Sequence, residues 1–182
     1  FLSPGPGYGG SCFPKDAAAV VDLARKNGYT FEIMEAVLSV NRRVKARMVE
    51  KVEAVCPDLA DKRVAMLGIA FKPETDDIRE SACLKLAADL MARGADVVAY
   101  DPAAMENAAK EMPSLKLADD VYSCAAGADV LVLATDWNQF RKLDLGRLEK
   151  TMKGKNFVDL RNLYEPKEMK KAGWNYAGLG RS

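Results

Sequence analysis

A cysteine, a lysine and an aspartate stand close together near the start of the sequence. Cys12, Lys15 and Asp16 follow a glycine-rich run, residues 5–10, and an apolar stretch typical of a helix begins directly after them. Glycine lets a backbone approach another group closely, and Pro14 suits the first turn of a helix, where its missing N–H costs nothing. We therefore expect Cys12 on a tight loop at a helix N-terminus, where the helix dipole and Lys15 both favour the nucleophilic thiolate. Asp16 lies one turn further on and is placed to hold a water or to act as a base.

The composition limits the other kinds of chemistry that the chain could carry. It has no histidine, which excludes a Ser-His-Asp triad or a Cys-His pair built from this chain alone. Its 4 cysteines contain no C-x-x-C pair, so we expect no metal site. A lone cysteine is commonly a small buried residue, and that reading stays open beside the catalytic one. Cys83 and Cys124 are expected to be buried, whereas Cys56, beside Pro57, is the one rival of Cys12 for exposure.

The charge balance and the apolar runs bear on partners and location. A net charge of +1 gives no electrostatic reason to expect nucleic acid or an anionic membrane as a partner. No apolar run approaches the roughly 20 residues that span a bilayer, and no signal peptide is visible, so we expect a cytoplasmic protein. The abrupt start at Phe1, with loop-like residues, predicts a fragment of a longer chain.

Two helices are expected after the cysteine loop. The first covers residues 16–26, and the second begins after an N-cap at Thr30 and extends to Val55. The second helix carries one apolar stripe with spacings of three and four, formed by Ile33, Val37, Val40, Val44, Met48, Val52 and Val55. A stripe of this length suits either packing on the chain's own domain or pairing with a second copy, and the pattern leaves both open.

From residue 58 onward the sequence alternates between strands and helices. We expect strands at residues 64–70, 96–100, 115–117, 129–134, 157–159 and 174–178, and helices at residues 78–93, 103–111, 121–126, 145–152 and 167–172. Continuously apolar strands between helices predict a parallel sheet covered on both faces, which is a doubly wound, Rossmann-like α/β fold. The predicted domains are residues 1–56, the cysteine loop with its helices, and residues 57–182, the α/β domain.

Ligands of doubly wound sheets bind beyond the carboxyl ends of the strands. The first strand is followed by residues 68–73, GIAFKP, and not by G-x-G-x-x-G, so this domain lacks the usual dinucleotide fingerprint. At this edge Lys72 and Arg79 suit phosphate oxygens, although single charges are more commonly solvated surface groups. The other candidates expected there are Phe71, Thr75, Asp76, Asp77, Asp101, Thr135, Asp136, Trp137, Asp159, Arg161 and Asn162. Thr135 and Asp136 fit a role as turn and cap residues equally well.

Three motifs resemble signatures of the UDP-glucose 6-dehydrogenases, a branch of the nucleotide-sugar dehydrogenase family. They are GPGYGGSCFPKD at residues 5–16, GIAFKPETDDIRES at residues 68–81 and DLRN at residues 159–162, where many members have glycine in place of Leu160. The resemblance covers essentially the whole chain. Family members begin with an NAD-binding domain that carries G-x-G-x-x-G, a catalytic lysine and an asparagine, and none of it is present here.

The resemblance implies roles for individual residues. Cys12 would be the covalent nucleophile, and Asp16 would position the hydrolytic water. Lys15 and Arg79 would reach the phosphates of NAD. Contacts with a UDP-sugar are implied for Phe1, Leu2, Ser3, Pro4, Gly5, Gly9, Lys72 and Arg161.

The activity implied by the resemblance is the oxidation of UDP-glucose to UDP-glucuronate by two hydride transfers, through a thiohemiacetal and a thioester on Cys12. The implied partners are the UDP-sugar, the N-terminal NAD-binding domain of the same chain, and a second copy paired through the long central helix. Two alternatives remain: a dehydrogenase of GDP-mannose or UDP-N-acetylmannosamine, and a non-catalytic nucleotide-binding or dimerisation module. The FKP and PGY details resemble the UDP-glucose branch more closely. Without the NAD-binding domain, this chain alone is expected to be inactive.

Overall fold

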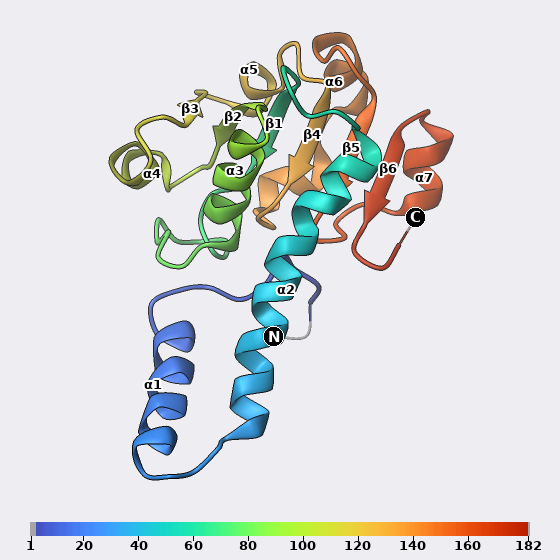
Figure 1. Ribbon diagram of the computed structural model, residues 1–182. Helices are drawn as coiled ribbons and strands as arrows, with labels where there is room; N and C mark the ends of the chain where they lie inside the picture. Colours follow the sequence, from blue (N-terminus) through green and yellow to red (C-terminus); the bar gives the residue numbers. More distant parts are fainter. Residues whose placement is uncertain (1–2, 182) are drawn as a thin grey trace.

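The computed structural model describes residues 3–181, and within them a helical hairpin precedes a six-stranded sheet that has helices on both faces (Figure 1). The elements in chain order are α1 (Phe13–Lys26), α2 (Glu32–Val55), β1 (Arg63–Leu67), α3 (Ala82–Ala92), β2 (Asp96–Tyr100), α4 (Met105–Glu111), β3 (Lys116–Leu117), α5 (Val121–Ala125), β4 (Val130–Leu133), the 3-10 helix η1 (Asn138–Lys142), α6 (Leu145–Thr151), β5 (Asn156–Asp159), α7 (Pro166–Lys171) and β6 (Asn175–Gly178). Between residues 3 and 181, no helix combines the length and the apolar character that crossing a membrane requires.

The sheet has the strand order β3-β2-β1-β4-β5-β6, and all neighbouring strands are parallel. The order reverses between β1 and β4, because the chain moves outward to β3 on one side and returns to build the other side. The predicted doubly wound α/β fold is therefore confirmed. In such a sheet, ligands bind beyond the carboxyl ends of the strands, next to this reversal.

The side chains of each strand alternate between two buried cores. Val64 and Met66 of β1 belong to the core that contains residues of α2, α3 and α4. Ala65 and Leu67 of the same strand belong to the core formed with α5, α6 and α7. Both faces of the sheet are covered, which explains why the strands are apolar throughout instead of alternating with polar residues.

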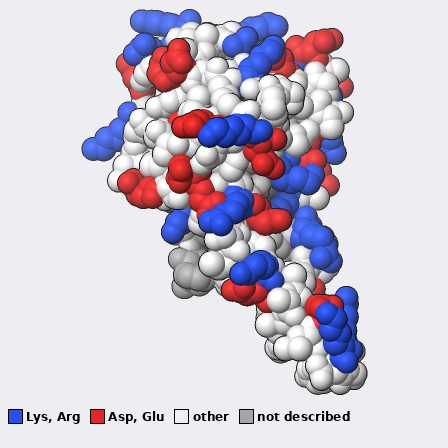
Figure 2. All heavy atoms as spheres, turned by 90° about the vertical axis from the view of Figure 1, so that its left-hand side faces the viewer, with Lys and Arg blue, Asp and Glu red and all other residues white. Residues whose placement is uncertain are grey.

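The helices α1 and α2 form a hairpin that projects away from the sheet (Figure 1). Only the second half of α2 is buried, and Met48, Val49, Val52 and Val55 face the core. The first half stands in the projecting arm, where the side chain of Ile33 is 73% exposed. Figure 2 shows this arm as the narrow end of the molecule, with Lys and Arg interspersed among Asp and Glu on the visible face. The chain's own domain thus covers about half of the predicted apolar stripe.

Three predicted helix starts are wrong, and the reasons are local. The helix α1 begins at Phe13, three residues before the expected position, and α2 begins after Phe31 without a side-chain cap from Thr30. The helix α3 begins after Ser81 and not at residue 78, because the Ser81 hydroxyl accepts the N–H groups of the next helical turn. The preceding residue, Glu80, has a φ of 52°, which a helix cannot accommodate.

Two further features were not predicted. The strand β1 ends at Leu67 because Gly68 has a φ of 102° and a side chain there would collide with Thr135. The predicted strand therefore ends earlier than residue 70, and the chain turns away at the carboxyl edge of the sheet. The 3-10 helix η1 lies in a connection for which the sequence pattern predicts no helix or strand.

Candidate functional site

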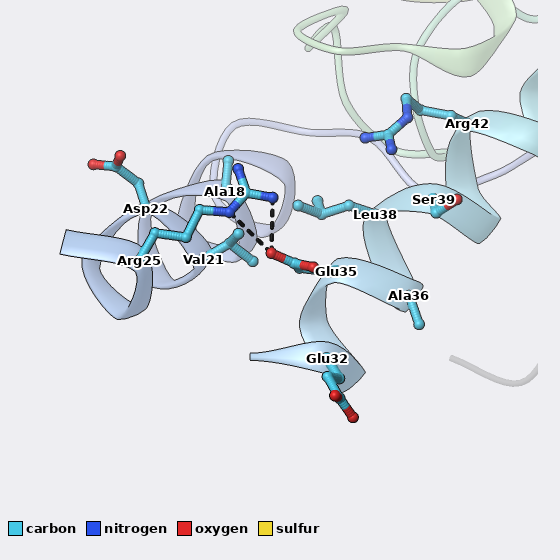
Figure 3. A pocket seen from close by; sticks show the side chains of 10 residues that line it. All are labelled: Ala18, Val21, Asp22, Arg25, Glu32, Glu35, Ala36, Leu38, Ser39 and Arg42. Carbon is cyan, nitrogen blue, oxygen red and sulfur yellow. Dashed lines mark hydrogen bonds and ion pairs between the residues drawn. The ribbon is translucent and has the colours of Figure 1, made fainter. Parts of the chain in front are cut away.

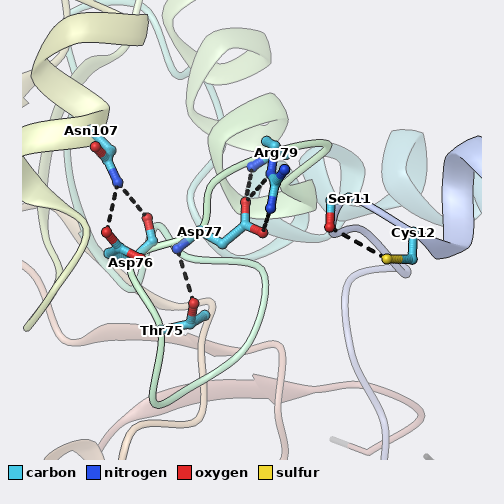
Figure 4. A network of polar contacts seen from close by, with 7 residues as sticks. All are labelled: Ser11, Cys12, Thr75, Asp76, Asp77, Arg79 and Asn107. Carbon is cyan, nitrogen blue, oxygen red and sulfur yellow. Dashed lines mark hydrogen bonds and ion pairs between the residues drawn. The ribbon is translucent and has the colours of Figure 1, made fainter.

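Cys12 lies at the N-cap of α1 with Pro14 in the first helical turn, as the sequence predicts. The backbone N–H of Asp16 donates to the Cys12 carbonyl at 2.8 Å, which closes that turn. The Cys12 thiol is exposed, and its Sγ lies 3.6 Å from the hydroxyl oxygen of Ser11 (Figure 4). The thiol is therefore open to an incoming ligand at the N-terminal end of α1.

The other three cysteines are buried. Cys83 and Cys124 meet the prediction, and burial raises the pKa of the Cys124 thiol to about 12. The expected exposure of Cys56 is wrong, because its side chain is 4% exposed and lies in the core beneath α2. Burial, followed by the negative charge of Asp129, raises the pKa of the Cys56 thiol. Among the described residues, Cys12 is the cysteine that can react.

The glycine loop before Cys12 is held tightly by the rest of the chain. A Cβ on Gly9 would lie 3.0 Å from the carbonyl carbon of Glu80 and closer still to its oxygen. The N–H of Gly10 donates to the Arg79 carbonyl at 2.9 Å, and a Cβ on Gly10 would lie 2.9 Å from the Phe71 ring. These glycines therefore permit close packing against the chain itself, in addition to any contact with a ligand.

A hollow of about 560 Å³ lies on one side of this loop, and we call it the Lys72 hollow. It is lined by Ser3, Gly5, Gly7, Tyr8, Gly9, Phe13, Phe71, Lys72 and Arg161. Five of the residues predicted to contact a UDP-sugar are brought together here, namely Ser3, Gly5, Gly9, Lys72 and Arg161. Pro4 is exposed and does not line the hollow, and Phe1 and Leu2 lie outside the described residues.

The Lys72 hollow combines aromatic walls with one exposed cation. The rings of Tyr8 and Phe13 meet edge to face with centroids 4.7 Å apart, and the Lys72 ammonium lies 5.5 Å from the Phe71 ring centroid. A flexible, exposed ammonium beside flat apolar surfaces suits a ligand that carries both a phosphate and a ring.

Arg161 is largely committed to the protein. Its side chain is 14% exposed, and its guanidinium donates to the Ala134 carbonyl at 2.8 Å and to the Phe71 carbonyl at 3.2 Å. The remaining Nη1 lies 3.6 Å from an Asp136 oxygen and faces Gly5. Leu160 points into the core, so the leucine in place of the family's glycine does not alter the hollow.

A second hollow of about 600 Å³, the Arg79 hollow, lies beside the same loop. It brings together Lys15 and Arg79, the two residues predicted to reach a dinucleotide phosphate. It also contains Arg42 and Lys45 from α2, which the sequence analysis missed. Their spacing of three residues, on one face of a helix, was the available signal. Four cations with Glu80 as the one acidic lining residue are a donor set that fits phosphate oxygens.

Arg79 is held in place by Asp77. The guanidinium donates to both carboxylate oxygens, at 3.0 Å and 2.7 Å (Figure 4). This contact is the largest influence on both groups. It holds the pKa of the Asp77 carboxyl below its usual range and raises the pKa of Arg79. Asp77 is itself fixed, because its backbone N–H donates to the Thr75 hydroxyl at 3.2 Å. The Arg79 side chain, which is 68% exposed, is therefore oriented although it reaches into solvent.

Several residues expected at the ligand edge serve the fold instead. Asp101 is fully buried and accepts the N–H groups of Ile69 and Ala70, together with the indole N–H of Trp137. Thr135 and Asp159 are also fully buried. The Thr135 hydroxyl donates to the Ala70 carbonyl, and the Asp159 carboxylate accepts the backbone N–H of Tyr164 and the hydroxyl of Tyr176. Asp101 and Asp159 therefore do not face a ligand as predicted, because Asp101 caps the turns that follow β1 and β2 and Asp159 caps the turn that follows β5. Thr135 takes the alternative role of a turn residue, because its hydroxyl binds the turn after β1.

The hairpin arm carries a further depression between α1 and α2, which contains polar and charged residues (Figure 3). Arg25 of α1 and Glu35 of α2 bridge it, with nitrogen–oxygen distances of 2.9 Å and 2.7 Å. This ion pair ties the two helices together near the tip of the arm. Across residues 3–181, no cluster of three His, Cys, Asp or Glu side chains could hold a metal ion.

Comparison with known proteins gives two family matches. Residues 65–166 match the UDP binding domain of the UDP-glucose/GDP-mannose dehydrogenase family, and residues 1–43 match its central domain. The chain is 46% identical over all of its length to UDP-glucose 6-dehydrogenase of Rhizobium meliloti, and it spans 42% of that protein.

Solved structures give the same picture. A UDP-glucose dehydrogenase from Pyrobaculum islandicum matches 90% of this chain with a TM-score of 0.81 and 36% identity. A UDP-D-ManNAc dehydrogenase from Pyrococcus horikoshii matches 98% with a TM-score of 0.78 and 27% identity. This chain covers 37% and 40% of those two chains, respectively, so it spans about two fifths of its relatives.

Proposed function

The chain belongs to the UDP-glucose/GDP-mannose dehydrogenase family, and on that premise we propose that it supplies the cysteine nucleophile and the nucleotide-sugar site of an NAD-dependent UDP-glucose 6-dehydrogenase. One observation carries the proposal. The exposed Cys12 follows a loop that borders the Lys72 hollow on one side and the Arg79 hollow on the other. Cys12 itself lines neither hollow, but its chain neighbours do: Ser11 lines the Arg79 hollow and Phe13 lines the Lys72 hollow. A thiol next to both hollows suits an oxidation that needs a sugar nucleotide and a second phosphate-bearing ligand.

The substrate would occupy the Lys72 hollow. Lys72 offers a positive charge to the phosphates, while Phe71 and Tyr8 offer flat surfaces. Gly5 and Gly9 line the hollow, and their lack of side chains lets Arg161 and the Glu80 carbonyl, respectively, approach them closely. The division of the chain at residue 56 into a loop-and-helix unit and a nucleotide-sugar domain is part of the same proposal.

Cys12 would act on the aldehyde that the first oxidation produces at C6 of the sugar. Its thiolate adds to the carbonyl carbon and gives a thiohemiacetal. Loss of a hydride from that adduct leaves a thioester, which water hydrolyses to the carboxylate and the free thiolate. Asp16 lies one helical turn from Cys12, and one of its carboxylate oxygens lies 3.5 Å from the Lys15 ammonium. A carboxylate at this place suits the role of holding that water.

The cations of the Arg79 hollow, Lys15, Arg42, Lys45 and Arg79, fit the phosphates of NAD. NAD, when bound, would supply the hydride acceptor for both oxidations. This chain's contribution is to hold the phosphates and to keep Arg79 oriented through Asp77. The NAD-binding domain of such an enzyme would be a partner segment, and the 182-residue chain alone is expected not to turn over NAD.

The identity of the nucleotide sugar can be tested by calorimetry on the 182-residue chain. We expect UDP-glucose to bind more tightly than GDP-mannose or a UDP-N-acetyl sugar, because the relative that is 46% identical is a UDP-glucose 6-dehydrogenase. Lys72→Ala should weaken binding by about tenfold or more, since a charge-assisted hydrogen bond contributes roughly 1.5–3 kcal/mol. Lys110→Ala removes another exposed lysine, which pairs with Glu106, and serves as the control. Tighter binding of GDP-mannose, or equal effects of the two substitutions, would refute the assignment.

The arm supports a second copy of the chain as a partner. Ile33 and Val40 on α2 are 73% and 46% exposed, and Leu23 of α1 is 62% exposed. Ile33 and Val40 belong to the part of the apolar stripe that the chain's own domain leaves open, and Leu23 adds an exposed apolar side chain from α1. We therefore restrict the proposed dimer contact to the arm, whereas Val44 packs against the core and belongs to the fold.

A further inference from the structure

Asn41 lies in the middle of α2, outside every motif of the sequence, and it binds the cysteine loop with both ends of its amide. Its Oδ1 accepts the backbone N–H of Tyr8 at 2.9 Å, and its Nδ2 donates to the Tyr8 carbonyl at 3.2 Å. One side chain thus satisfies both backbone groups of a loop residue 33 positions away. Asparagine is a weak helix former, so its presence in a helix interior calls for such an external partner.

The amide is closely fitted to the loop. A Cβ on Gly7 would lie 2.8 Å from the Asn41 Oδ1, and Gly7 has a φ of 115°, which favours glycine. On the far side of the loop, the Gly10 N–H donates to the Arg79 carbonyl. The backbone is therefore held from α2 at Tyr8 and from the segment before α3 at Gly10, and Cys12 follows two residues later.

We propose that Asn41 is a positioning residue for Cys12. It fixes the loop by its two hydrogen bonds to Tyr8, and the loop in turn sets where the thiol stands relative to both hollows. Tyr8 lines the Lys72 hollow and the Arg79 hollow alike, so a shift of Tyr8 changes both walls. The effect on the loop is independent of the proposed function, whereas the effect on substrate binding rests on it.

Three variants of the 182-residue chain test this role. Asn41→Leu removes both hydrogen bonds and keeps the branching at Cγ and the helix. Asn41→Asp keeps an acceptor for the Tyr8 N–H and loses the donor to its carbonyl. Asn156→Leu is the matched control, because the Asn156 amide also makes two hydrogen bonds, to the Asp129 carbonyl and with Asn175, and it lies in β5 far from the loop in sequence.

The readouts are a nitroxide label on Cys12, followed by electron paramagnetic resonance, and hydrogen exchange at the Gly10 amide. The label reaches Cys12 selectively because the other cysteines are buried. We expect Asn41→Leu to make the label mobile and to speed exchange at Gly10 about tenfold or more, since two hydrogen bonds are lost. Asn41→Asp should give intermediate values of label mobility and exchange. Asn156→Leu should match the parent chain in both readouts, even if it lowers the melting temperature as much as Asn41→Leu does.

The proposal is overturned if Asn41→Leu leaves both readouts at the parent values, or if Asn156→Leu changes them equally. Calorimetry with UDP-glucose separates this result from the proposed function. A mobile label in Asn41→Leu, together with no binding of UDP-glucose to the parent chain, would keep the positioning role and refute the substrate. A label that stays immobile in Asn41→Leu, together with binding of UDP-glucose to the parent chain, would refute the positioning role and keep the substrate.

Discussion

Replacing Gly9 by alanine places a methyl group where the chain already has backbone. The new Cβ would lie 3.0 Å from the Glu80 carbonyl carbon, closer to its oxygen, and 3.4 Å from the Phe71 Cβ. Because the obstacle is a carbonyl and not the end of a flexible side chain, the loop and the residue 80 turn must separate by roughly 1 Å to reach ordinary contact. That movement also strains the hydrogen bond from Gly10 to Arg79.

The cost follows from these two effects. Overpacking of this kind costs about 1–3 kcal/mol, and a weakened backbone hydrogen bond adds about 1 kcal/mol. For a chain of this size, a loss of about 3 kcal/mol lowers the melting temperature by roughly 6–12 °C. Gly9 also lines the Lys72 hollow, so the affinity for UDP-glucose should fall along with stability.

Thermal unfolding followed by circular dichroism measures the first effect, and calorimetric titration of UDP-glucose at 20 °C measures the second. Gly146→Ala is the control of opposite sign. Gly146 lies in α6, and the nearest atom to a Cβ there is an Asp144 oxygen at 3.4 Å, which is ordinary contact. Alanine at this helical position should stabilise the chain by up to about 1 kcal/mol. If Gly9→Ala unfolds within 1 °C of the parent chain, the tight packing of the loop described above is refuted.

Three other predictions concern the thiol, the ion pair and the arm. A limiting dose of iodoacetamide near neutral pH should alkylate Cys12 first, because it is the exposed cysteine; preferential labelling of Cys56 by mass spectrometry would contradict this. The contact with Arg79 lowers the pKa of Asp77. The ion pair therefore contributes its full stabilisation at pH values above the ordinary carboxyl pKa of about 3.9, and this contribution is lost as the pH falls through the lowered pKa. The difference in melting temperature between the parent and Asp77→Asn should therefore shrink on acidification from about pH 5 to about pH 2, and a constant difference would exclude the linkage. Light scattering should find a dimer that Val40→Glu converts to a monomer of similar stability, whereas a monomeric parent at high concentration would count against the arm as an interface.

The fold could be predicted because its strands carry an unambiguous signal. The residues of β1 and β4 are apolar without interruption, and the only common structure that buries both faces of a strand is a parallel sheet with helices on each side. The start of α3 could not be predicted in the same way. Ile78 continues the apolar helical pattern, but the cap at Ser81 and the positive φ of Glu80 decide where the helix begins.

The candidate site was predicted less completely, for a physical reason. A polar residue shortly after a strand has the same local pattern whether it lines an open hollow, as Lys72 does, or caps a buried turn, as Asp101 does. Only the three-dimensional contacts separate the two. Asn41 was missed for a related reason, because it reaches the loop from a helix 33 positions further along the chain, and no local motif marks it.

The position of Asn41 connects the arm with the nucleophile. The helix α2 has 24 residues, and its buried residues begin at Met48, so Asn41 stands just where the helix leaves the sheet domain. The helix α1 begins directly after Cys12 and runs along the arm to the turn before α2 (Figure 1). The glycine-rich loop that precedes Cys12 is held by Asn41 at Tyr8 and by the Arg79 carbonyl at Gly10. A partner that covers the exposed apolar residues of the arm would therefore bear on the two helices that frame Cys12, which links the proposed dimer contact to the geometry of the thiol.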